Sequence, residues 1–499
     1  MFSLRFLRNY NKQLSILRLK SISAANTTAK VNDKDGAVQY MGQPTNETHP
    51  HLINEGEVVP LITKLELQER RQKLIDLITS QTRKRYPELN RHVIVIPSAT
   101  KKYMSEKIPY VFRQHSDFLY LTGCMEPDSC LVITASTSPG QHQSTLFLRE
   151  KDQHSEIWDG PRTGPENAVR LFGVDQSLPM KELSSFMQCC AQPTSSSLLW
   201  YNFKESPLPE VDTILQEYFK KVFSKVWDNP TSCIHNLRVI KSPAEIKLMQ
   251  RSCEIASEAI RKTMHFSRPG VNEHEIFATV DYECRKMGAE MLAYPPVVAG
   301  GDRATIIHYI NNNQMVRDGD MVLMDAGCEY HGYSSDITRT WPVNGQFNNV
   351  QAAAYEALLD VQTQLIDAMK KRPTLNQLYQ LMCQLLAIRL GDIGLIDSKS
   401  DMNTKMRNAY DFCPHHVSHY LGMDVHDTGS VSRDIPLQPG MIITIEPGIY
   451  VNYKHEAPKE FKGLGLRIED DVLVTEDGPV VLTANCPKTL KDVEAASSS

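Results

Sequence analysis

The sequence predicts an α+β protein with two domains, an N-terminal α/β domain and a C-terminal α+β domain. The chain has 499 residues, which is more than one hydrophobic core usually spans. Short apolar runs mixed with helical patterns fill residues 51–235, as is typical of an α/β domain. Residues 236–495 carry helical patterns first and strand patterns afterwards, which favours α+β.

Composition and charge argue against two classes of protein. Hydrophobic residues make up 41% of the chain, and 54 Lys and Arg against 59 Asp and Glu leave a net charge of −5. The chain therefore lacks the basic excess that nucleic-acid-binding proteins carry. No apolar run approaches the roughly 18 to 20 residues that a bilayer span needs. We expect neither nucleic acid nor a membrane as a partner.

Cysteine usage indicates a reducing compartment. The chain has 11 cysteines, an odd number, and none of them lies in a C-x-x-C pair. A disulfide framework needs paired cysteines and an oxidising environment. We therefore expect free thiols, most of them buried.

The first 32 residues contain basic residues but no acidic ones. Arg5, Arg8 and Arg18 are interspersed with Leu, Ile and Phe, and the first acid is Asp33. This pattern is typical of a mitochondrial transit peptide, and there is no unbroken apolar stretch like that of a secretory signal. We expect residues 1–50 to be a transit peptide and linker that direct the protein to the mitochondrial matrix, with a cytosolic pool where the leader is skipped. A disordered basic tail is the alternative.

The N-terminal domain is predicted to contain at least three strands and a helix. The strands are apolar runs at residues 92–97, 129–134 and 145–148, each bounded by Pro, Gly or polar residues. Residues 65–78 have helical spacing, with Arg70 and Arg71 expected to face outward. This domain has no concentrated cluster of potential metal ligands, which points to the second domain for the chemistry.

The C-terminal domain is predicted to start with two helices. A turn-rich stretch at residues 227–232 precedes it. An N-cap residue followed three positions later by an acid occurs at Ser242–Glu245 and again at Asn272–Glu275, and each pair is typical of a capping box. The first of these helices is expected to run to about Met264.

A short internal repeat lies further along this domain. In Gly319–Gly327 and again in Gly440–Gly448, a glycine is followed after five residues by an acid and after one more residue by a second glycine. A four-residue apolar run comes immediately before the acid in both copies. The repeat predicts two buried strands that each deliver one carboxylate, Asp325 or Glu446, to a shared site. A chance match of this length is the alternative.

Five features between residues 300 and 470 carry residue types that bind metals or transfer protons. The turn at residues 329–332 places Asp325 and Asp336 on opposite arms of a hairpin, where facing side chains lie roughly 4.5 to 5.5 Å apart at Cβ. The features are residues 306–310 with His308, the pair Asp325 and Asp336, residues 415–426 with His415, His419 and His426, residues 443–450 with Glu446 and Tyr450, and residues 465–474 with Arg467 and Glu469.

Each feature alone has an ordinary structural interpretation. A single Asp after a strand is a common turn former, and Asp470 and Asp471 fit a solvated loop. Arg467 and Glu469 lie two apart on a strand and fit a surface pair, while His416 fits a structural neighbour. Together the features favour a buried site, because carboxylates at the ends of apolar strands are costly to bury unless cations pair with them.

Charge balance favours two divalent ions at this site. Four carboxylates carry −4, which two divalent ions neutralise, and one His completes the donor set. Such oxygen-dominated coordination suits Mn²⁺ and, less selectively, Co²⁺, Fe²⁺ or Zn²⁺. Two adjacent ions can hold and acidify a bridging water, which predicts hydrolysis. The four acids are Asp325, Asp336, Glu446 and Glu469.

Three runs resemble the signatures of the "pita-bread" metallopeptidases, which include Xaa-Pro aminopeptidase, prolidase and, more distantly, methionine aminopeptidase. They are H-x-x-S-H-x-L-G-x-D-V-H-D from His415, T-I-E-P-G-I-Y from Thr444 and G-x-R-I-E-D-D from Gly465. The runs D-F-L-Y-L-T-G from Asp117 and E-I-W-D-G from Glu156 are similar to the N-terminal domain of aminopeptidase P. The resemblance covers nearly all of residues 50–490 and is greatest to the mitochondrial Xaa-Pro aminopeptidases. It implies a creatinase/aminopeptidase-P-like domain followed by a pita-bread catalytic domain.

The resemblance also implies a role for each candidate residue. Asp336 and Glu469 would bridge both ions, and Glu446 would also accept the proton of the bridging water. The five ligands would be Asp325, Asp336, His419, Glu446 and Glu469; His308, His415 and His426 would line the substrate pocket; and Arg467 and Tyr450 would hold the metal-binding residues in place. His416 departs from the family's usual residue at its position, which bears on substrate preference.

We therefore expect a manganese aminopeptidase that releases the N-terminal residue from peptides and proteins with proline in the second position, with possible trimming of imported mitochondrial proteins. Family likeness implies a homodimer. Prolidase, which cleaves Xaa-Pro dipeptides alone, and an inactive peptide-binding scaffold are the alternatives.

Overall fold

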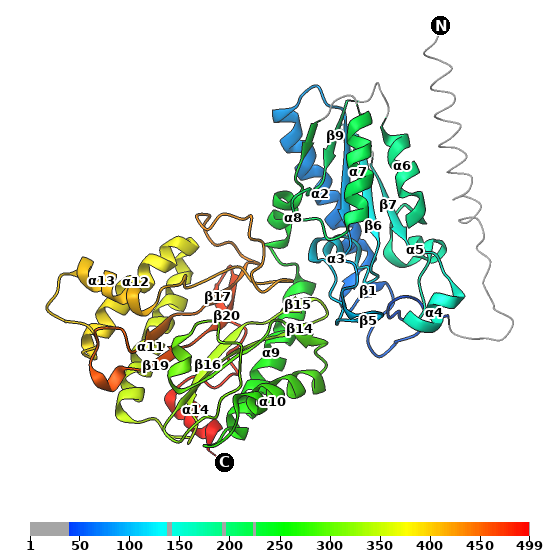
Figure 1. Cartoon of the computed structure of the whole chain (residues 1–499). Helices are drawn as coiled ribbons and strands as arrows, with labels where there is room; N and C mark the ends of the chain where they lie inside the picture. Colours follow the sequence, from blue (N-terminus) through cyan, green and yellow to red (C-terminus); the bar gives the residue numbers. More distant parts are fainter. Residues whose placement is uncertain (1–38, 137–141, 192–195, 223–225, 499) are drawn as a thin grey trace, which may run out of the picture. The chain divides into compact units, whose positions relative to one another are not determined.

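The structure is a computed structural model that describes residues 39–136, 142–191, 196–222 and 226–498. The part of the expected leader up to residue 38 lies outside the described residues. The chain divides into two compact units, of which the first ends at Ile234 and the second begins at His235 (Figure 1). Each unit is described by itself below.

The first unit is built on a six-stranded mixed sheet. Strand β6 is antiparallel to its neighbours β3 and β7, and the three outer pairings are parallel. The predicted strands correspond to β3, β6 and β7, whose residues are almost all buried and alternate between the two faces. In sheet order the strands are β10 (Val226–Asp228), β9 (Ser197–Trp200), β3 (Arg91–Pro97), β6 (Cys130–Ser136), β7 (His142–Leu148) and β8 (Gln176–Pro179).

Seven helices and two small hairpins complete the described part of this unit. The hairpins are β1 (Glu57–Val59) with β2 (Ile62–Thr63), and β4 (Tyr103–Ser105) with β5 (Ile108–Pro109). The helices are α2 (Lys64–Arg85), α3 (Ser116–Thr122), α4 (Gln153–Asp159), α5 (Pro165–Phe172), α6 (Leu183–Cys190), α7 (Pro209–Lys221) and α8 (Thr231–Arg238), the last of which crosses into the second unit.

Two arginines of α2 do not face outward as predicted. Arg70 and Arg71 are 4% and 2% exposed. Arg71 donates hydrogen bonds to the carbonyl oxygens of Leu121 and Gly173, and Arg70 donates to that of Tyr120. The helix therefore uses two guanidinium groups to satisfy carbonyl groups at helix ends, which helical spacing alone does not reveal.

The second unit repeats an order of helices followed by strands. The sequence predicted one such set, which is wrong because three helices divide the strands into two groups. The first set is α9 (Pro243–Phe266), α10 (Glu273–Lys286), β11 (Met291–Leu292), β12 (Val297–Gly300), β13 (Met321–Ala326), β14 (Cys328–Tyr330), β15 (Tyr333–Ser334) and β16 (Ile337–Pro342). The second set is α11 (Asn349–Ala368), α12 (Leu375–Asp392), α13 (Met402–Phe412), β17 (Ile442–Ile445), β18 (Gly448–Val451), β19 (Leu464–Arg467), β20 (Asp470–Thr475) and β21 (Gly478–Val481), before α14 (Leu490–Ser497).

The two halves of the predicted repeat lie in separate sheets. Strand β13 runs between β12 and β16, and β17 pairs with β20, which pairs with β21, all antiparallel. Helices α9 and α10 flank these strands on one side, and α11, α12 and α13 on another (Figure 1). The core between helices and sheets includes Trp341, Tyr355 and Ile443, all fully buried.

Both predicted helix starts are confirmed. Ser242 and Glu245 form a capping box at α9, and Asn272 and Glu275 form one at α10. Helix α9 continues two residues beyond Met264, to Phe266. These caps satisfy the first backbone N–H groups of helices that pack against the strands of the site.

The cysteines are free, as predicted, and all except Cys189 are buried. No helix within the described ranges has the length and apolar character to cross a bilayer.

Candidate metal centre

The four predicted carboxylates converge, although they come from the ends of different strands. Asp325 is the penultimate residue of β13, and Asp336 directly precedes β16. Glu446 directly follows β17, and Glu469 lies between β19 and β20. Asp336 and Glu469 are buried, while the other two are partly buried.

Asp325 and Asp336 lie on opposite arms of the hairpin, but they do not face each other directly as the sequence predicted. Asp325 pairs with Thr338, and Ala326 pairs with Ile337, so Asp336 lies diagonally across from Asp325. The strands come very close here, because a Cβ on Gly327 would lie 1.7 Å from the carbonyl oxygen of Ser335. The close approach keeps both carboxylates on one face.

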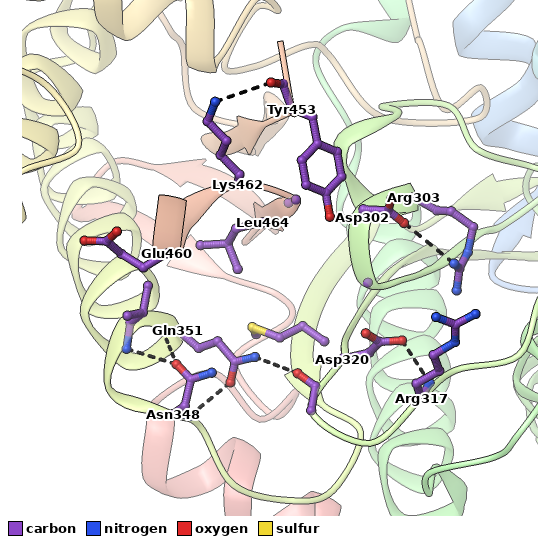
Figure 2. A pocket seen from close by; sticks show the side chains of 16 residues that line it. Asp302, Arg303, Arg317, Asp320, Asn348, Gln351, Tyr453, Glu460, Lys462 and Leu464 are labelled. Atoms are coloured by element: carbon purple, nitrogen blue, oxygen red, sulfur yellow. Dashed lines mark hydrogen bonds and ion pairs between the residues drawn. The ribbon is translucent and has the colours of Figure 1, made fainter. Parts of the chain in front are cut away.

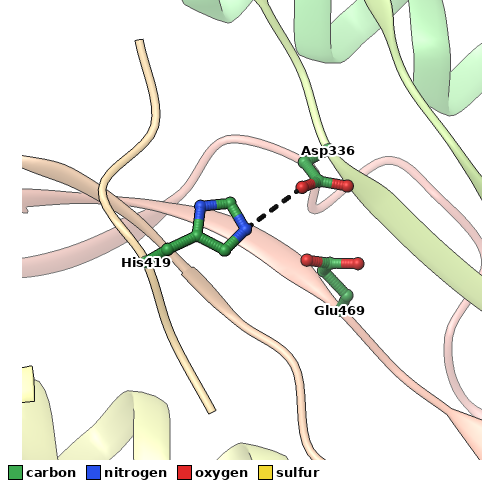
Figure 3. A group of neighbouring side chains, drawn as sticks. All are labelled: Asp336, His419 and Glu469. Atoms are coloured by element: carbon green, nitrogen blue, oxygen red, sulfur yellow. Dashed lines mark ion pairs between the residues drawn. The ribbon is translucent and has the colours of Figure 1, made fainter. Parts of the chain in front are cut away.

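His419 presents one ring nitrogen to the acids. Its Nε2 lies 3.3 Å from Asp336 Oδ2 and 3.7 Å from Glu446 Oε1. Its Nδ1 lies 3.1 Å from the carbonyl oxygen of Tyr420, so Nδ1 carries a proton and donates it. In the neutral ring Nε2 is then free to bind a metal. Ligand atoms of Asp336, His419 and Glu469 all lie within 4.8 Å of one another (Figure 3).

Arg467 is the fixed positive charge of the centre. Its Nη2 lies 2.5 Å from Asp325 Oδ2 and its Nη1 lies 2.8 Å from the hydroxyl of Tyr450. Its Nε donates to Thr338 Oγ1, which donates in turn to Glu469 Oε2 at 2.5 Å. Within the described part of the chain, Arg467 is the only Arg or Lys in an ion pair with any of the four acids. The centre therefore has an excess of negative charge.

Two polar residues of the centre were missed by the sequence analysis. The hydroxyl of Tyr294 lies 2.6 Å from Asp325 Oδ1 and 2.6 Å from Asp336 Oδ1, and it can donate to one of them at a time. Thr338 connects Arg467 to Glu469, as above. Thr338 could have been found by working out the hairpin register, because it pairs with Asp325 where β13 runs beside β16. No spacing pattern marks Tyr294, which lies before β12.

Proton affinities reflect the excess of negative charge. Burial raises the pKa of Glu446 to about 7, and burial followed by the charge of Asp336 raises the pKa of Glu469 well above its usual range. Burial opposes the charge of His419, but its hydrogen bond to Asp336 and the charge of Glu446 outweigh burial and raise its pKa to about 9. The site thus holds protons where cations are missing, and its carboxylate and imidazole donors fit divalent metal ions.

The two acids after Glu469 are not solvated loop residues. Asp470 and Asp471 lie on β20 and are fully buried. Arg339 binds Asp470 at 2.7 Å, and Asp471 Oδ2 accepts the backbone N–H of Asp336 at 3.0 Å. The surface-pair interpretation of Arg467 and Glu469 is also wrong, because each is 2% exposed.

The predicted substrate histidines lie around this centre at different depths. His415 Nε2 is 3.0 Å from the Tyr450 hydroxyl, and burial followed by the charge of Arg467 lowers the pKa of His415 to about 4. The ring of His426 lies 4.6 Å from that of His419, and its residue is exposed. His308 is exposed in a turn after the 3₁₀ helix of residues 301–305. Burial, followed by the charge of His419, lowers the pKa of His426.

His416 has a structural environment. Its ring stacks on Tyr379 with centroids 5.0 Å apart, and its Nδ1 lies 2.9 Å from the carbonyl oxygen of Ser418. Burial followed by the charge of Arg433 lowers its pKa to about 4. The stacking on Tyr379 and the contact with Ser418 favour the structural interpretation.

A separate cavity of about 450 Å³ lies in the same unit (Figure 2). It is lined by Met321 and Leu464, the first residues of β13 and β19, whose other ends carry Asp325 and Arg467. Among its lining residues, Asp302 pairs with Arg303 at 3.8 Å, and Asp320 accepts the backbone N–H of Arg317 at 2.8 Å. Because it lies at the opposite ends of these two strands, the cavity is separate from the candidate metal centre.

Comparisons with known proteins agree with this fold and site. Residues 247–476 match the model of metallopeptidase family M24, and residues 67–200 match that of the aminopeptidase P N-terminal domain. The solved structure of zinc-substituted Escherichia coli aminopeptidase P in complex with product has a TM-score of 0.80 and 32% identity, and the match covers 87% of this chain and 98% of that one. With the relatives described next, these matches show that the chain belongs to metallopeptidase family M24 and is a metal-dependent aminopeptidase.

Within the family, the chain is similar over most of its length to a particular group. It is 42% identical to Xaa-Pro aminopeptidase 3 of Homo sapiens over 468 residues, covering 92% of this chain and 91% of the relative. It is 39% identical to the mitochondrial intermediate cleaving peptidase 55 of Arabidopsis thaliana over 457 residues, covering 92% and 87%. The predicted fold class and the resemblance to mitochondrial Xaa-Pro aminopeptidases are confirmed.

The proton affinities predict how pH acts on the metal-free chain. Glu446 and His419 bind protons more tightly when folded than when unfolded, so the free energy of unfolding should fall as pH rises. Glu446 should lower the free energy of unfolding between pH 4.5 and about pH 7, since its pKa rises from 4.5 to about 7 on folding. His419 should lower it between pH 6.5 and about pH 9, since its pKa rises from 6.5 to about 9. Mn²⁺ should reverse the loss, because it takes the place of the protons.

The measurement is the thermal unfolding midpoint of the chelator-treated full chain between about pH 5 and pH 9, with and without Mn²⁺. The midpoint gain from Mn²⁺ should grow with pH, and should grow less in Glu446→Gln. An equal gain in midpoint from Mn²⁺ at about pH 5 and about pH 9 would contradict the assignment of Glu446 and His419 as the groups whose protons the metal replaces.

Proposed function

We propose that the chain hydrolyses the peptide bond between an N-terminal residue and a penultimate proline, using two Mn²⁺ ions. The observation that carries this proposal is the convergence of four carboxylates and one imidazole around a single arginine. Such an arrangement is stable at neutral pH when divalent cations supply the missing positive charge. The similarity to Xaa-Pro aminopeptidase 3 of Homo sapiens supports the choice of substrate.

The proposed ligands are the five residues of the donor set. Asp336 and Glu469 are the most buried of the four proposed acidic ligands, and both have ligand atoms within 4.8 Å of one of His419. This position supports a role for both in holding the two ions. Bound ions would lower the pKa of a water and polarise the scissile carbonyl. Glu446 would accept the proton of the attacking water, since a carboxylate with a raised pKa is a suitable base. The remaining ligands are Asp325 and His419.

Two of the proposed substrate contacts, His308 and His426, are exposed, and His415 is partly buried. His426 would contact the scissile carbonyl and the developing oxyanion, and His308 the region of the proline. His415 donates to or accepts from the Tyr450 hydroxyl, which accepts from Arg467. This chain of contacts supports the proposal that His415 shapes the pocket, while Tyr450 and Arg467 keep Asp325 in place. The free amine of the substrate would lie near the ions.

The proposal is tested on the purified chain with Mn²⁺ and an Xaa-Pro-Yaa-Zaa peptide, followed by mass spectrometry. We expect release of the first residue, and loss of nearly all turnover in Asp336→Ala or Glu469→Ala, because each variant would remove a ligand proposed to hold both ions. Asp302→Ala, in the cavity of Figure 2, removes an acid away from the centre and should retain activity.

The alternatives give different results in the same experiment. A prolidase would leave the tetrapeptide intact and cut the Xaa-Pro dipeptide. An inactive scaffold would bind less than one ion per chain and cut neither peptide. Either result would refute the proposed function, and retained turnover in Asp336→Ala or Glu469→Ala would refute the bridging roles.

We further propose that the protein acts in the mitochondrial matrix on imported proteins. The basic, acid-free leader supports this, as does the similarity to the mitochondrial intermediate cleaving peptidase 55 of Arabidopsis thaliana. Residues 1–50 fused to a fluorescent protein should carry it into mitochondria, and replacing Arg5, Arg8 and Arg18 by Glu should abolish import. A fusion that stays cytosolic would contradict this location.

We also propose a homodimer. Apolar side chains lie exposed on the β4–β5 hairpin and on α4, including Tyr103 at 55%, Ile108 at 55% and Trp158 at 78%. Lys101 binds Asp159 at 3.0 Å, which ties the start of the hairpin to α4. Large exposed apolar patches commonly mark interfaces. Sedimentation should give twice the chain mass of 56.5 kDa, and Ile108→Asp with Trp158→Asp should give monomer; a monomeric parent chain would refute the dimer.

A further inference from the structure

A buried cluster of charges is centred on Asp427, the residue that follows His426 in the sequence. Asp427 Oδ1 is 2.5 Å from Arg238 Nη2, and Asp427 Oδ2 is 3.3 Å from Lys241 Nζ. The side chains of Arg238, Lys241 and Asp427 are 3%, 1% and 1% exposed, whereas His426 is exposed. At this depth the ion pairs are poorly screened and depend strongly on geometry. The cluster therefore holds Asp427 in one position.

The carboxylate of Asp427 also shapes the loop that leads to His426. The backbone N–H of Asp427 donates to the carbonyl oxygen of Tyr420 at 2.9 Å. The backbone N–H of Gly422 donates to the backbone carbonyl oxygen of Asp424 at 3.1 Å. A Cβ on Gly422 would lie 2.4 Å from Asp427 Oδ2. The loop thus wraps closely around the carboxylate, and only glycine leaves room for it at that point.

The residue after Asp427 is strained. Thr428 has a φ of +48°, a region that β-branched residues rarely adopt, and it is 2% exposed. Such a conformation persists where the surrounding contacts determine it. The carbonyl oxygen of Thr428 accepts the backbone N–H of Val431 at 2.8 Å, and the ion pairs of Asp427 with Arg238 and Lys241 hold the residue before it. The strained turn is therefore fixed from both sides.

The loop of residues 420–427 lies next to the candidate metal centre at both of its ends. Tyr420, which accepts from Asp427, follows His419, and the rings of His419 and His426 lie 4.6 Å apart. The carbonyl oxygen of Gly422 accepts the backbone N–H of Ser334 at 2.9 Å, two residues before Asp336. A small movement of Asp427 would therefore move His426 relative to the metal ligands.

We propose that Arg238, Lys241 and Asp427 are positioning residues that fix the imidazole of His426 against the substrate side of the metal centre. The proposal rests on the proposed function, because it assumes that His426 contacts the substrate. Arg238 ends α8 and Lys241 precedes α9, so the first residues of the second unit set the geometry of a residue nearly 190 positions later.

The test is a double-mutant cycle in the full chain with Mn²⁺ and the tetrapeptide substrate. Asp427→Asn keeps the size of the side chain and removes its charge. It should lower kcat/KM about 100-fold, mainly through kcat, because misplacing a catalytic group by about 1 Å has an effect of that order. The metal content should stay at the parent value, since Asp427 contacts none of the proposed ligands' side chains.

The His426→Ala background separates positioning from a general structural role. His426→Ala alone should lower kcat/KM by roughly 10² to 10³. Adding Asp427→Asn should then cost less than about threefold, because the group that Asp427 positions is already missing. Independent losses that multiply, an unchanged kcat/KM in Asp427→Asn, or a loss of bound metal would each overturn the proposal.

Two further variants keep the cycle decisive. Should Asp427→Asn fail to fold, Asp424→Asn replaces it, because Asp424 binds the same Arg238 Nη2 at 2.8 Å and its side chain is 36% exposed. Asp212→Asn makes the same chemical change at a partly buried carboxylate of the first unit and should leave kcat/KM unchanged. A parent chain without activity would refute the proposed function, whereas an active parent with an additive cycle refutes this inference alone.

Discussion

The structure of the second unit depends on burying more negative than positive charge at one place. Asp325, Asp336, Glu446 and Glu469 face one another with Arg467 as their one Arg or Lys partner in the described ranges. A buried carboxylate without a partner is costly, so an arrangement of this kind is costly to form without added positive charge. The metal-free chain meets that need with protons, which is why the pKa values of Glu446, Glu469 and His419 rise.

The fold produces this convergence by using strand ends. Asp325 and Glu446 occupy matching places at the ends of β13 and β17, which lie in different sheets of the twofold helix-and-strand order. Antiparallel pairing then adds one acid from each neighbouring strand, Asp336 beside β16 and Glu469 before β20. The four acids lie at strand ends and His419 and His426 lie on loops, so the proposed metal centre depends both on the sheets and on the loop that carries the two histidines.

The sequence was sufficient where a local pattern has one physical meaning. The capping boxes at Ser242 and Asn272 and three strands of the first unit, β3, β6 and β7, follow from local patterns. The four acids of the proposed site stood out beside apolar runs, whereas His419 was chosen among neighbouring histidines by the family resemblance. The sequence was insufficient where a role depends on distant partners. Tyr294 has no pattern that distinguishes it from a core tyrosine, and Arg70 and Arg71 resemble surface residues until Leu121 and Gly173 are placed beside them.

Balanced buried charges nearby show what sets the metal centre apart. Asp470 has Arg339 and Lys488 as partners, and Asp427 has Arg238 and Lys241, so each carboxylate is matched by protein cations. These groups fix the backbone on two sides of the centre, at Glu469 and at His426, without needing an added ion. Burial of acids is therefore common in this unit, and the gathering of four of them around one arginine is what supports metal binding by that set. The balanced clusters give that set the rigid surroundings that a metal site requires.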